Sequence, residues 1–236
     1  MSERIIGILT EGLGKMLLAS VKVTLPLTVI GFAFAMVIAL VMAMVQYAKV
    51  PILSQLSRLY IWVFRGTPLL VQLFLAFYGL PKLGIVLDPF PCAVIVFSLN
   101  EGAYCAETMR AALEAVPAGQ VEAGYCVGLS YMQIMAKIVL PQAMRTAFPS
   151  LSNNLISMLK DTSLAAEITV ADMFMAAKKI VGRTYEAFWL YAEVALIYLF
   201  YSTILTLIQR RLEKKLSAYN SREAAPGSRR QSNESA

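Results

Sequence analysis

Long apolar runs separated by short polar stretches dominate the chain. Five runs approach or exceed the roughly 20 helical residues that a bilayer requires. They cover residues 16–45, 59–80, 92–113, 148–168 and 188–208. This pattern predicts an all-α integral membrane protein, with five transmembrane helices in one domain that covers residues 1–216.

Polar segments connect these runs. The longest, residues 114–145, has mixed charge and helical character. Residues 217–236 are rich in Ser, Arg, Ala and Glu, and we expect a disordered basic tail there. Two prolines are expected to disturb helices: Pro26 breaks the first run, and Pro141 stops a helix at the preceding turn.

The basic residues predict the orientation. The net charge is +6, and seven of the 21 Lys and Arg residues follow position 208. With the N-terminus outside, the inner side carries those seven and five others, twelve in all, against seven on the outer side. The five others are Lys49, Arg58, Arg110, Lys137 and Arg145. The excess favours an outer N-terminus and a cytoplasmic C-terminus. Beside an apolar helix, a basic tail indicates the cytoplasmic face rather than nucleic acid, so we expect a lipid partner and no nucleic acid.

Residue types give little support to catalysis or metal binding. The chain has no His, and its three cysteines, Cys92, Cys105 and Cys126, lack metal-type spacing. A phosphate-binding loop needs two glycines and a hydroxyl around its lysine. The nearest fragment, Gly14-Lys15-Met16, lacks the first glycine and the hydroxyl. We therefore expect no catalytic residue, metal or cofactor in this chain.

One polar segment carries a specific motif. It reads Glu122-Ala123-Gly124, then Gly128, then Ile138-Val139-Leu140-Pro141. This resembles the EAA loop of binding-protein-dependent ABC importer permeases, with Gly124 in place of the second Ala. Small residues allow another surface to approach closely, and Gly128 supplies a bend between two helices. The alternative is an ordinary interfacial amphipathic helix. The resemblance implies contact with an ATPase through Glu122, Ala123, Gly124, Gly128 and Leu129.

The resemblance covers about residues 20–215. Residues 64–72, 103–107 and 159–164 look like signatures of the polar amino-acid branch, and residues 77–81 and 87–89 look closest to cystine permeases. The family implies a type I-like fold in the bacterial inner membrane. It also implies a second permease subunit, identical or homologous, an external amino-acid-binding protein and a dimer of cytoplasmic ABC ATPases that hold ATP and Mg.

Polar residues inside the apolar runs are candidates for the substrate site, because charges are costly at that depth. Three runs each offer one polar stripe. The stripes contain Arg65 and Gln72 in the second run, Asn100, Tyr104 and Glu107 in the third, and Asn154, Ser157 and Asp161 in the fourth. The predicted substrate-binding residues are Arg65, Gln72, Asn100, Tyr104, Glu107, Asp161 and Ser163. The alternative is that the charges only pair with one another, as Arg65–Glu107 and Lys160–Asp161. Glu101 receives no role.

These observations favour a transport subunit that moves a polar amino acid by alternating access, with ATP hydrolysed by a partner. Cystine is one candidate cargo, and glutamine, glutamate and basic amino acids are the alternatives. Two other classes are open, a passive channel and a membrane enzyme. A channel would need no coupling loop, and the absence of His removes the commonest catalytic base from an enzyme.

Overall fold

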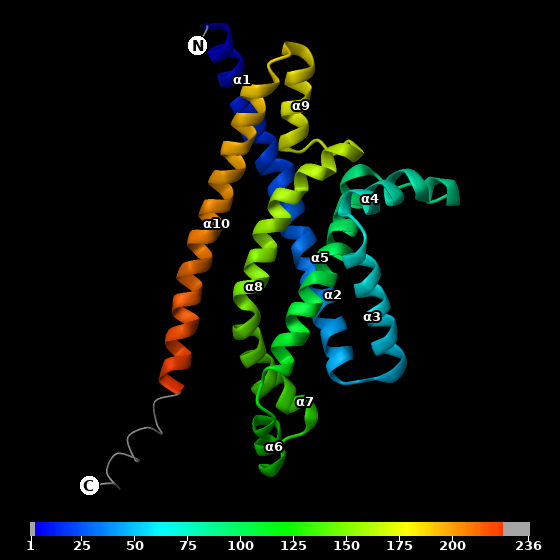
Figure 1. The fold of residues 1–236 in the computed structure, drawn as a ribbon, viewed down its shortest axis with the longest axis vertical. Helices are drawn as coiled ribbons and strands as arrows, with labels where there is room; N and C mark the ends of the chain where they lie inside the picture. The colour runs from blue at the N-terminus through cyan, green and yellow to red at the C-terminus, as the bar shows by residue number, and fades with distance from the viewer. Residues whose placement is uncertain (1–2, 224–236) are drawn as a thin grey trace, which may run out of the picture.

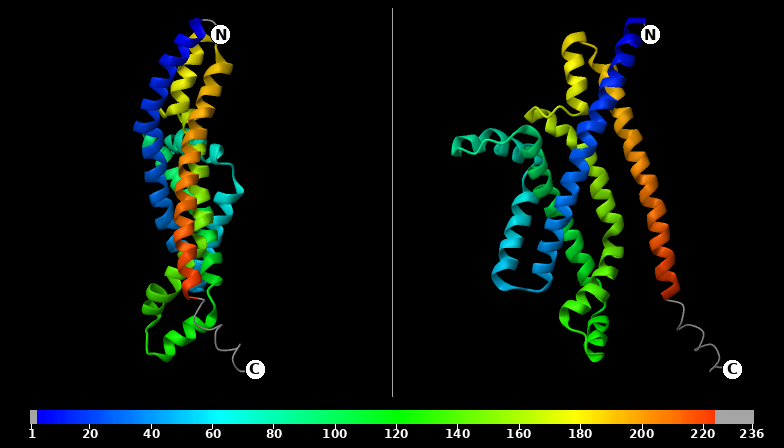
Figure 2. Two further views of the ribbon diagram at one scale, coloured as in Figure 1. Left: turned by 90° about the vertical axis from the view of Figure 1, so that its left-hand side faces the viewer. Right: turned by 180° about the vertical axis from the view of Figure 1, so that it is seen from behind.

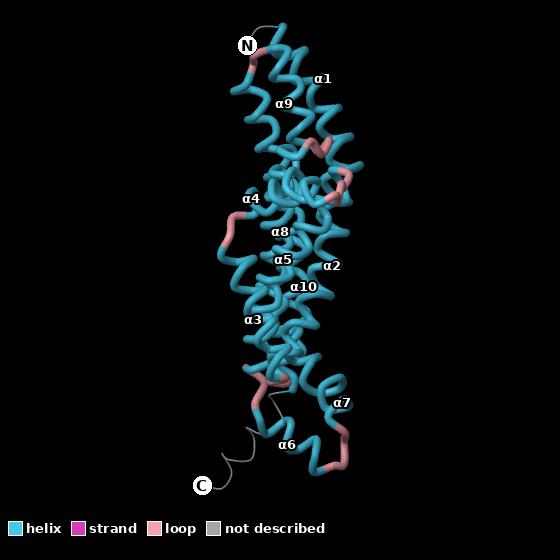
Figure 3. Tube along the Cα trace, turned by 90° about the vertical axis from the view of Figure 1, so that its right-hand side faces the viewer, coloured by secondary structure: helices cyan, strands magenta, loops and turns pink. Residues whose placement is uncertain are grey.

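The computed structural model describes the backbone of residues 3–223 and the side chains of residues 3–215. Within residues 3–223 the chain is helical, with short connecting loops and no strand (Figures 1 and 3). The expected all-α class is therefore confirmed. The long helices run roughly parallel to one axis, and short helices cover the ends.

The first three elements form one continuous helix of 45 residues, Glu3–Tyr47. They are α1 (Glu3–Ala19), the π-helical turn η1 (Ser20–Thr24) and α2 (Leu25–Tyr47). Our expectation that Pro26 breaks this run is wrong. The wider turn η1 precedes the proline, and Leu25 N–H bonds to the carbonyl of Ser20. The π turn accommodates the ring and the missing N–H without ending the helix.

The same arrangement occurs at two other Leu–Pro pairs. The π turn η2 (Leu75–Gly79) precedes Leu80-Pro81, and η4 (Met135–Val139) precedes Leu140-Pro141. The expectation that Pro141 stops a helix is therefore also wrong. Pro141 lies in the first turn of α8 (Leu140–Asp161), and the backbone stays helical from α7 (Tyr131–Ile134) through η4 into α8.

The predicted second span, residues 59–80, is not a straight helix. The helix α3 (Pro51–Gly66) ends before Thr67 and Pro68, and α4 (Leu69–Phe74) leads into η2 and η3 (Leu80–Leu83). The two parts meet at 103°. Pro68 disfavours a helical conformation at Thr67, which is extended. In Figure 1 the second part projects sideways near the top of α3.

The helix α5 (Pro89–Glu114) is the centre of the bundle. It packs against α2, α3 and α8, and it carries buried residues along its whole length. The contact with α2 uses small residues, because Ala35, Ala39 and Ala43 are fully buried at four-residue spacing. A Cβ on Gly102 would lie 3.0 Å from Ile38 Cγ2. Small side chains thus set the close approach of α2 and α5.

The C-terminal part forms a second group. The predicted fourth span, residues 148–168, begins eight residues after the start of α8 at Leu140. Its last residues are not α-helical, because the 3₁₀ segment η5 (Thr162–Ile168) follows α8. After it, α9 (Met173–Thr184) packs against α1 and α10 (Ala187–Glu223). Because α10 continues to Glu223, the expected tail starts too early. Residues 224–236 lie outside the described residues.

Length and apolarity support fewer spans than the five expected. Within residues 3–223, two helices meet both criteria, Glu3–Tyr47 and Ala187–Lys215, and the bent pair Pro51–Gly66 and Leu69–Leu83 gives a third. The helices α5 and α8 are long but polar for a membrane span. The count of five spans stays a prediction.

The two ends of the bundle differ. The first residues of α1 lie with α9 at one end, and the helices α6 (Ala118–Cys126) and α7 lie at the other (Figure 2). The α2–α3 turn and the end of α10 point toward the same end as α6 and α7. We call this the elbow end. An odd number of membrane crossings fits this arrangement.

Candidate functional site

A cavity of about 440 Å³ lies where the α3–α4 break meets α5 and α8. We call it the break cavity. Two of the three polar stripes expected from the sequence meet here, because Asn100 and Tyr104 line one side and Asn154, Ser157 and Asp161 line the other. Arg65 and Gln72, the third stripe, are not in the lining. Thr67, Pro68, Leu69, Glu101 and Leu164 complete the lining.

Two amide side chains stabilise the break itself. Gln72 Nε2 donates to the carbonyl of Phe64 at 2.9 Å and to Thr67 Oγ1 at 2.8 Å. Asn100 Nδ2 donates to Gln72 Oε1 at 3.0 Å and to the same Phe64 carbonyl at 3.2 Å. These bonds satisfy a backbone acceptor left without an intrahelical partner at the end of α3. Gln72 thus supports the site from behind, whereas Asn100 also lines the cavity.

Two carboxylates, Glu101 and Asp161, line the break cavity. Glu101 is 8% exposed, and Asp161 lies at the end of α8. In the described part of the chain neither forms an ion pair. The adjacent Lys160 attracts the Asp161 carboxylate through space, but the two side chains do not form the contact ion pair considered as the alternative. Cys105 Sγ lies 3.6 Å from Glu101 Oε1 and accepts from Asn154 Nδ2 at 3.4 Å. Unpaired carboxylates at this depth are costly unless a cation joins them.

Glu101 is the residue that the sequence did not assign. Its neighbour Asn100 belongs to the predicted stripe, and helical spacing alone puts Glu101 about 100° away from it. The break at Thr67 and Pro68 opens space beside α5 wide enough for both residues to reach the cavity. The available signal was a charge at position 101 inside a run long enough to span the membrane.

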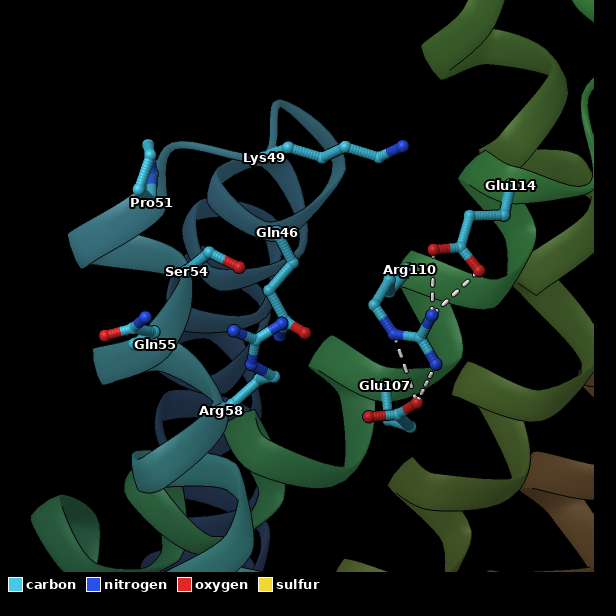
Figure 4. A pocket seen from close by; sticks show the side chains of 9 residues that line it. All are labelled: Gln46, Lys49, Pro51, Ser54, Gln55, Arg58, Glu107, Arg110 and Glu114. Carbon is cyan, nitrogen blue, oxygen red and sulfur yellow. Dashed lines mark hydrogen bonds and ion pairs between the residues drawn. The ribbon is translucent and has the colours of Figure 1, made fainter.

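Arg65 and Glu107 lie outside the lining of the break cavity. The Arg65 guanidinium carbon lies 5.3 Å from the centre of the Tyr104 ring, a cation–π distance. Its Nη1 lies 3.7 Å from Glu107 Oε2. Glu107 also pairs with Arg110, which in turn contacts Glu114 at 2.7 Å (Figure 4). The structural pair Arg65–Glu107 is therefore observed.

Ser163 does not line the cavity either. It lies in η5, and its Oγ donates to the carbonyl of Lys160 at 2.9 Å. This local bond uses the hydroxyl to satisfy a helix C-terminal acceptor. The structure brings Asn100, Tyr104 and Asp161 together at the cavity, while Arg65, Gln72, Glu107 and Ser163 surround or support it.

The expected coupling segment is a helix–turn–helix that we call the elbow, residues 118–134. Gly128 has a φ of +79°, and its N–H bonds to Tyr125 O while Leu129 N–H bonds to Gly124 O. This is a Schellman turn, which favours glycine. Ser130 then begins α7 with a capping box completed by Gln133. The bend expected at Gly128 is therefore present.

Gly124 has a different role from Gly128. A Cβ at Gly124 would lie 2.8 Å from Ile134 Cγ1, so the missing side chain allows α6 and α7 to pack on each other. Leu129 packs against the hydrophobic cluster beneath the elbow. Both residues shape the elbow from inside rather than forming its outer surface.

The outer surface of the elbow is unusually apolar. Val127 is 75% exposed, Met132 70% and Tyr125 52%, and Glu122 and Ala123 are also exposed. Exposed apolar groups clustered on a rigid turn are typical of a protein interface. Sequence patterning could not separate this surface from the packed side of the same short helices.

Comparison with known proteins agrees with this architecture. The family described as "Binding-protein-dependent transport system inner membrane component" matches residues 35–218. The L-cystine transport system permease protein TcyB of Bacillus subtilis (strain 168) is 45% identical over 197 residues, 83% of this chain and 84% of that protein. The probable amino-acid ABC transporter permease protein PatM of Vibrio harveyi is 41% identical over 85% of this chain and 92% of its own length.

A solved structure shows the same fold. An amino acid ABC transporter crystallised with histidines has a TM-score of 0.82 and 29% identity, and the match covers 91% of this chain and 100% of that one. The helical bundle, the elbow motif and these similarities together give one conclusion. The chain belongs to the family of inner-membrane permease components of binding-protein-dependent transport systems, as an amino-acid ABC importer permease subunit.

Proposed function

We propose that this permease carries cystine across the bacterial inner membrane and that the break cavity holds the cargo during transport. The observation that carries the proposal is the pair of carboxylates, Glu101 and Asp161, that line one cavity and form no ion pair in the described part of the chain. Cystine has two ammonium groups, and each carboxylate can accept one. The 45% identity to a permease named for L-cystine supports the same choice.

The remaining lining suits the carboxylates of a zwitterion. Asn154, Ser157 and Thr67 can offer amide or hydroxyl donors from two sides of the cavity. In the described part of the chain no Lys or Arg lines this cavity. That composition disfavours glutamate, whose side chain adds a negative charge. A basic amino acid is the second candidate, because its cationic side chain could occupy one carboxylate and its ammonium the other.

The elbow is the proposed contact with the ATPase. ATP and Mg would bind to a dimer of cytoplasmic ABC ATPases, and the exposed apolar side chains Tyr125, Val127 and Met132 would fill a groove on one of them. A second permease subunit would complete the pathway, and an external amino-acid-binding protein would deliver the cargo. In the orientation predicted from the Lys and Arg residues, the elbow end and the C-terminus face the cytoplasm. Closure of the ATPases would then move the elbows and expose the break cavity to the opposite side.

Competition for uptake tests the choice of cargo. Cells that express the chain with its ATPase and binding protein should accumulate radiolabelled L-cystine, and excess unlabelled cystine should suppress the signal. Glutamate in excess should leave uptake unchanged. If arginine or lysine competes better than cystine, the second candidate replaces the first.

A further inference from the structure

A second polar cavity, of about 620 Å³, lies at the elbow end (Figure 4). We call it the elbow-end cavity. It is lined by the end of α2, the α2–α3 turn, the first two turns of α3 and the last turns of α5. Nothing in the proposed cargo site uses it. Its lining contains three basic residues and two acidic ones.

The charges in this cavity are unevenly satisfied. The guanidinium of Arg110 contacts both acidic residues, Glu107 and Glu114, so those two carboxylates already have a partner. Lys49 and Arg58 line the same cavity, are exposed, and form no ion pair in the described part of the chain. The cavity therefore presents two cations without partners to whatever enters it.

The face of α3 that lines the elbow-end cavity indicates which kind of molecule can enter the cavity. The residues that line the cavity, Pro51, Ser54, Gln55 and Arg58, follow one helical stripe. The exposed apolar residues Ile52, Leu56 and Leu59 form a separate stripe. Because lipid is expected on the apolar stripe, the polar stripe faces an aqueous space. A water-borne anion fits this face better than a lipid headgroup.

A short layer of side chains separates the two cavities along α5. Tyr104 lines the break cavity, and Glu107, about one turn later, lines the elbow-end cavity. Arg65 contacts both, with its guanidinium carbon 5.3 Å from the Tyr104 ring centre and its Nη1 3.7 Å from Glu107 Oε2. Tyr104, Arg65 and Glu107 therefore form a layer between the linings of the two cavities.

We propose that the elbow-end cavity is a second binding site, in which Lys49 and Arg58 hold the carboxylate of the amino acid on its way out of the break cavity. The break cavity is acidic and the elbow-end cavity is basic. In the break cavity charged groups meet only the ammonium end of a zwitterion, and its carboxylate meets neutral donors. In the elbow-end cavity the charged partners without an ion pair, Lys49 and Arg58, meet the carboxylate instead. The identity of the anion as cargo rests on the proposed transport function.

Charge-selective labelling of a cysteine tests the site without any transport. Cys126 is exposed, whereas Cys92 and Cys105 are buried. Gln55→Cys in a Cys126→Ser background places one accessible thiol in the elbow-end cavity of the full chain in nanodiscs. We expect the anionic reagent sulfonatoethyl methanethiosulfonate to react faster than its trimethylammonium counterpart. The ratio of the two rates should exceed the ratio at native Cys126 by about threefold to tenfold.

Neutral replacements locate the source of that preference. Lys49→Gln and Arg58→Gln together should lower the ratio to the value found at Cys126, while Lys137→Gln, a charge removed from the same end outside the cavity, should not. Sodium acetate should slow labelling by a neutral methanethiosulfonate more than sodium chloride at equal ionic strength. The proposed site would be overturned if the cysteine at position 55 reacted equally fast with the anionic and cationic reagents. It would also be overturned if the double variant left the ratio of the two rates unchanged. Because the probes are not the proposed cargo, failed cystine uptake would not affect this result.

Discussion

Asp161 and Glu107 are both acidic and both lie on polar stripes, but their surroundings differ. Asp161 lines the break cavity and has no ion pair in the described residues, whereas Glu107 contacts Arg110 and lies 3.7 Å from Arg65. At the residue scale, one carboxylate is available for a cargo ammonium and the other is already satisfied.

This difference predicts opposite outcomes for matched amide substitutions. Asp161→Asn should raise the KM for uptake about tenfold or more, because a charge-assisted hydrogen bond contributes about 1.5–3 kcal/mol, with little change in melting temperature in detergent. Glu107→Gln should lower the melting temperature, since it leaves Arg110 and Arg65 with one partner fewer. The side chains of these pairs are 29% to 42% exposed, so the loss should be about 1 kcal/mol or less.

Uptake and thermal stability must be measured on the same variants. Normal uptake by Asp161→Asn would remove this carboxylate from the cargo site. A loss of stability in Asp161→Asn that parallels its loss of uptake would instead make it a structural residue of the bundle.

At the scale of elements, the α3–α4 break is the feature that creates the cavity. Pro68 explains why a break occurs here, and the neighbouring polar residues in the sequence were interpreted as cargo ligands. The amide of Gln72 instead joins the two helical parts through Phe64 and Thr67.

Gln72→Leu should therefore destabilise the break. The substitution removes the donor to Phe64 O and leaves the Asn100 amide with one partner fewer, so melting temperature and uptake should fall together. Gln142→Leu is the matched control, because the Gln142 amide bonds to Ile138 O within its own helix turn. If Gln72→Leu lowers uptake and leaves stability intact, the Gln72 side chain contacts cargo directly.

The elbow makes a second prediction at this scale. Val127→Asp places a charge in the most exposed apolar position of the elbow and should prevent co-purification of the ATPase. Val86→Asp is the control, since Val86 is 79% exposed and Val127 75%, and Val86 lies far along the chain in the loop before α5. Retention of the ATPase by Val127→Asp would show that the docking surface lies elsewhere on the permease.

The sequence predicted the helical class and the bend at Gly128. Of the three polar stripes it predicted, two contribute residues to the break cavity and the stripe with Arg65 and Gln72 does not. The sequence did not predict how prolines would act. A breaker such as Pro26 or Pro141 was expected to end a helix, but a π turn before each one lets the helix continue. Propensity describes single residues, whereas this outcome depends on the hydrogen-bonding pattern of the turn before the proline. Glu101 was missed for a related reason, because its access to the cavity depends on the break in another helix.

At the scale of the whole molecule, the elbow and the first residues of α1 lie at opposite ends of the bundle. The bias of Lys and Arg predicts that the elbow end is cytoplasmic. A cytoplasm-only reporter fused to the C-terminus and a periplasm-only reporter inserted after Lys82 should both be active. If both reporters were inactive although the protein was present in the membrane, the orientation would be the opposite of the one proposed.

The central claim is that this chain forms the pathway of an ATP-driven amino-acid importer. The most direct test is uptake of radiolabelled L-cystine into proteoliposomes that contain the purified permease and ATPase, with the binding protein outside and ATP on the elbow side. We predict accumulation that requires ATP and is reduced about tenfold or more by Asp161→Asn at cystine concentrations below the KM. Cystine flux that persists without ATP would indicate a channel. Vesicles that hydrolyse ATP but take up neither cystine nor any other amino acid would contradict the account.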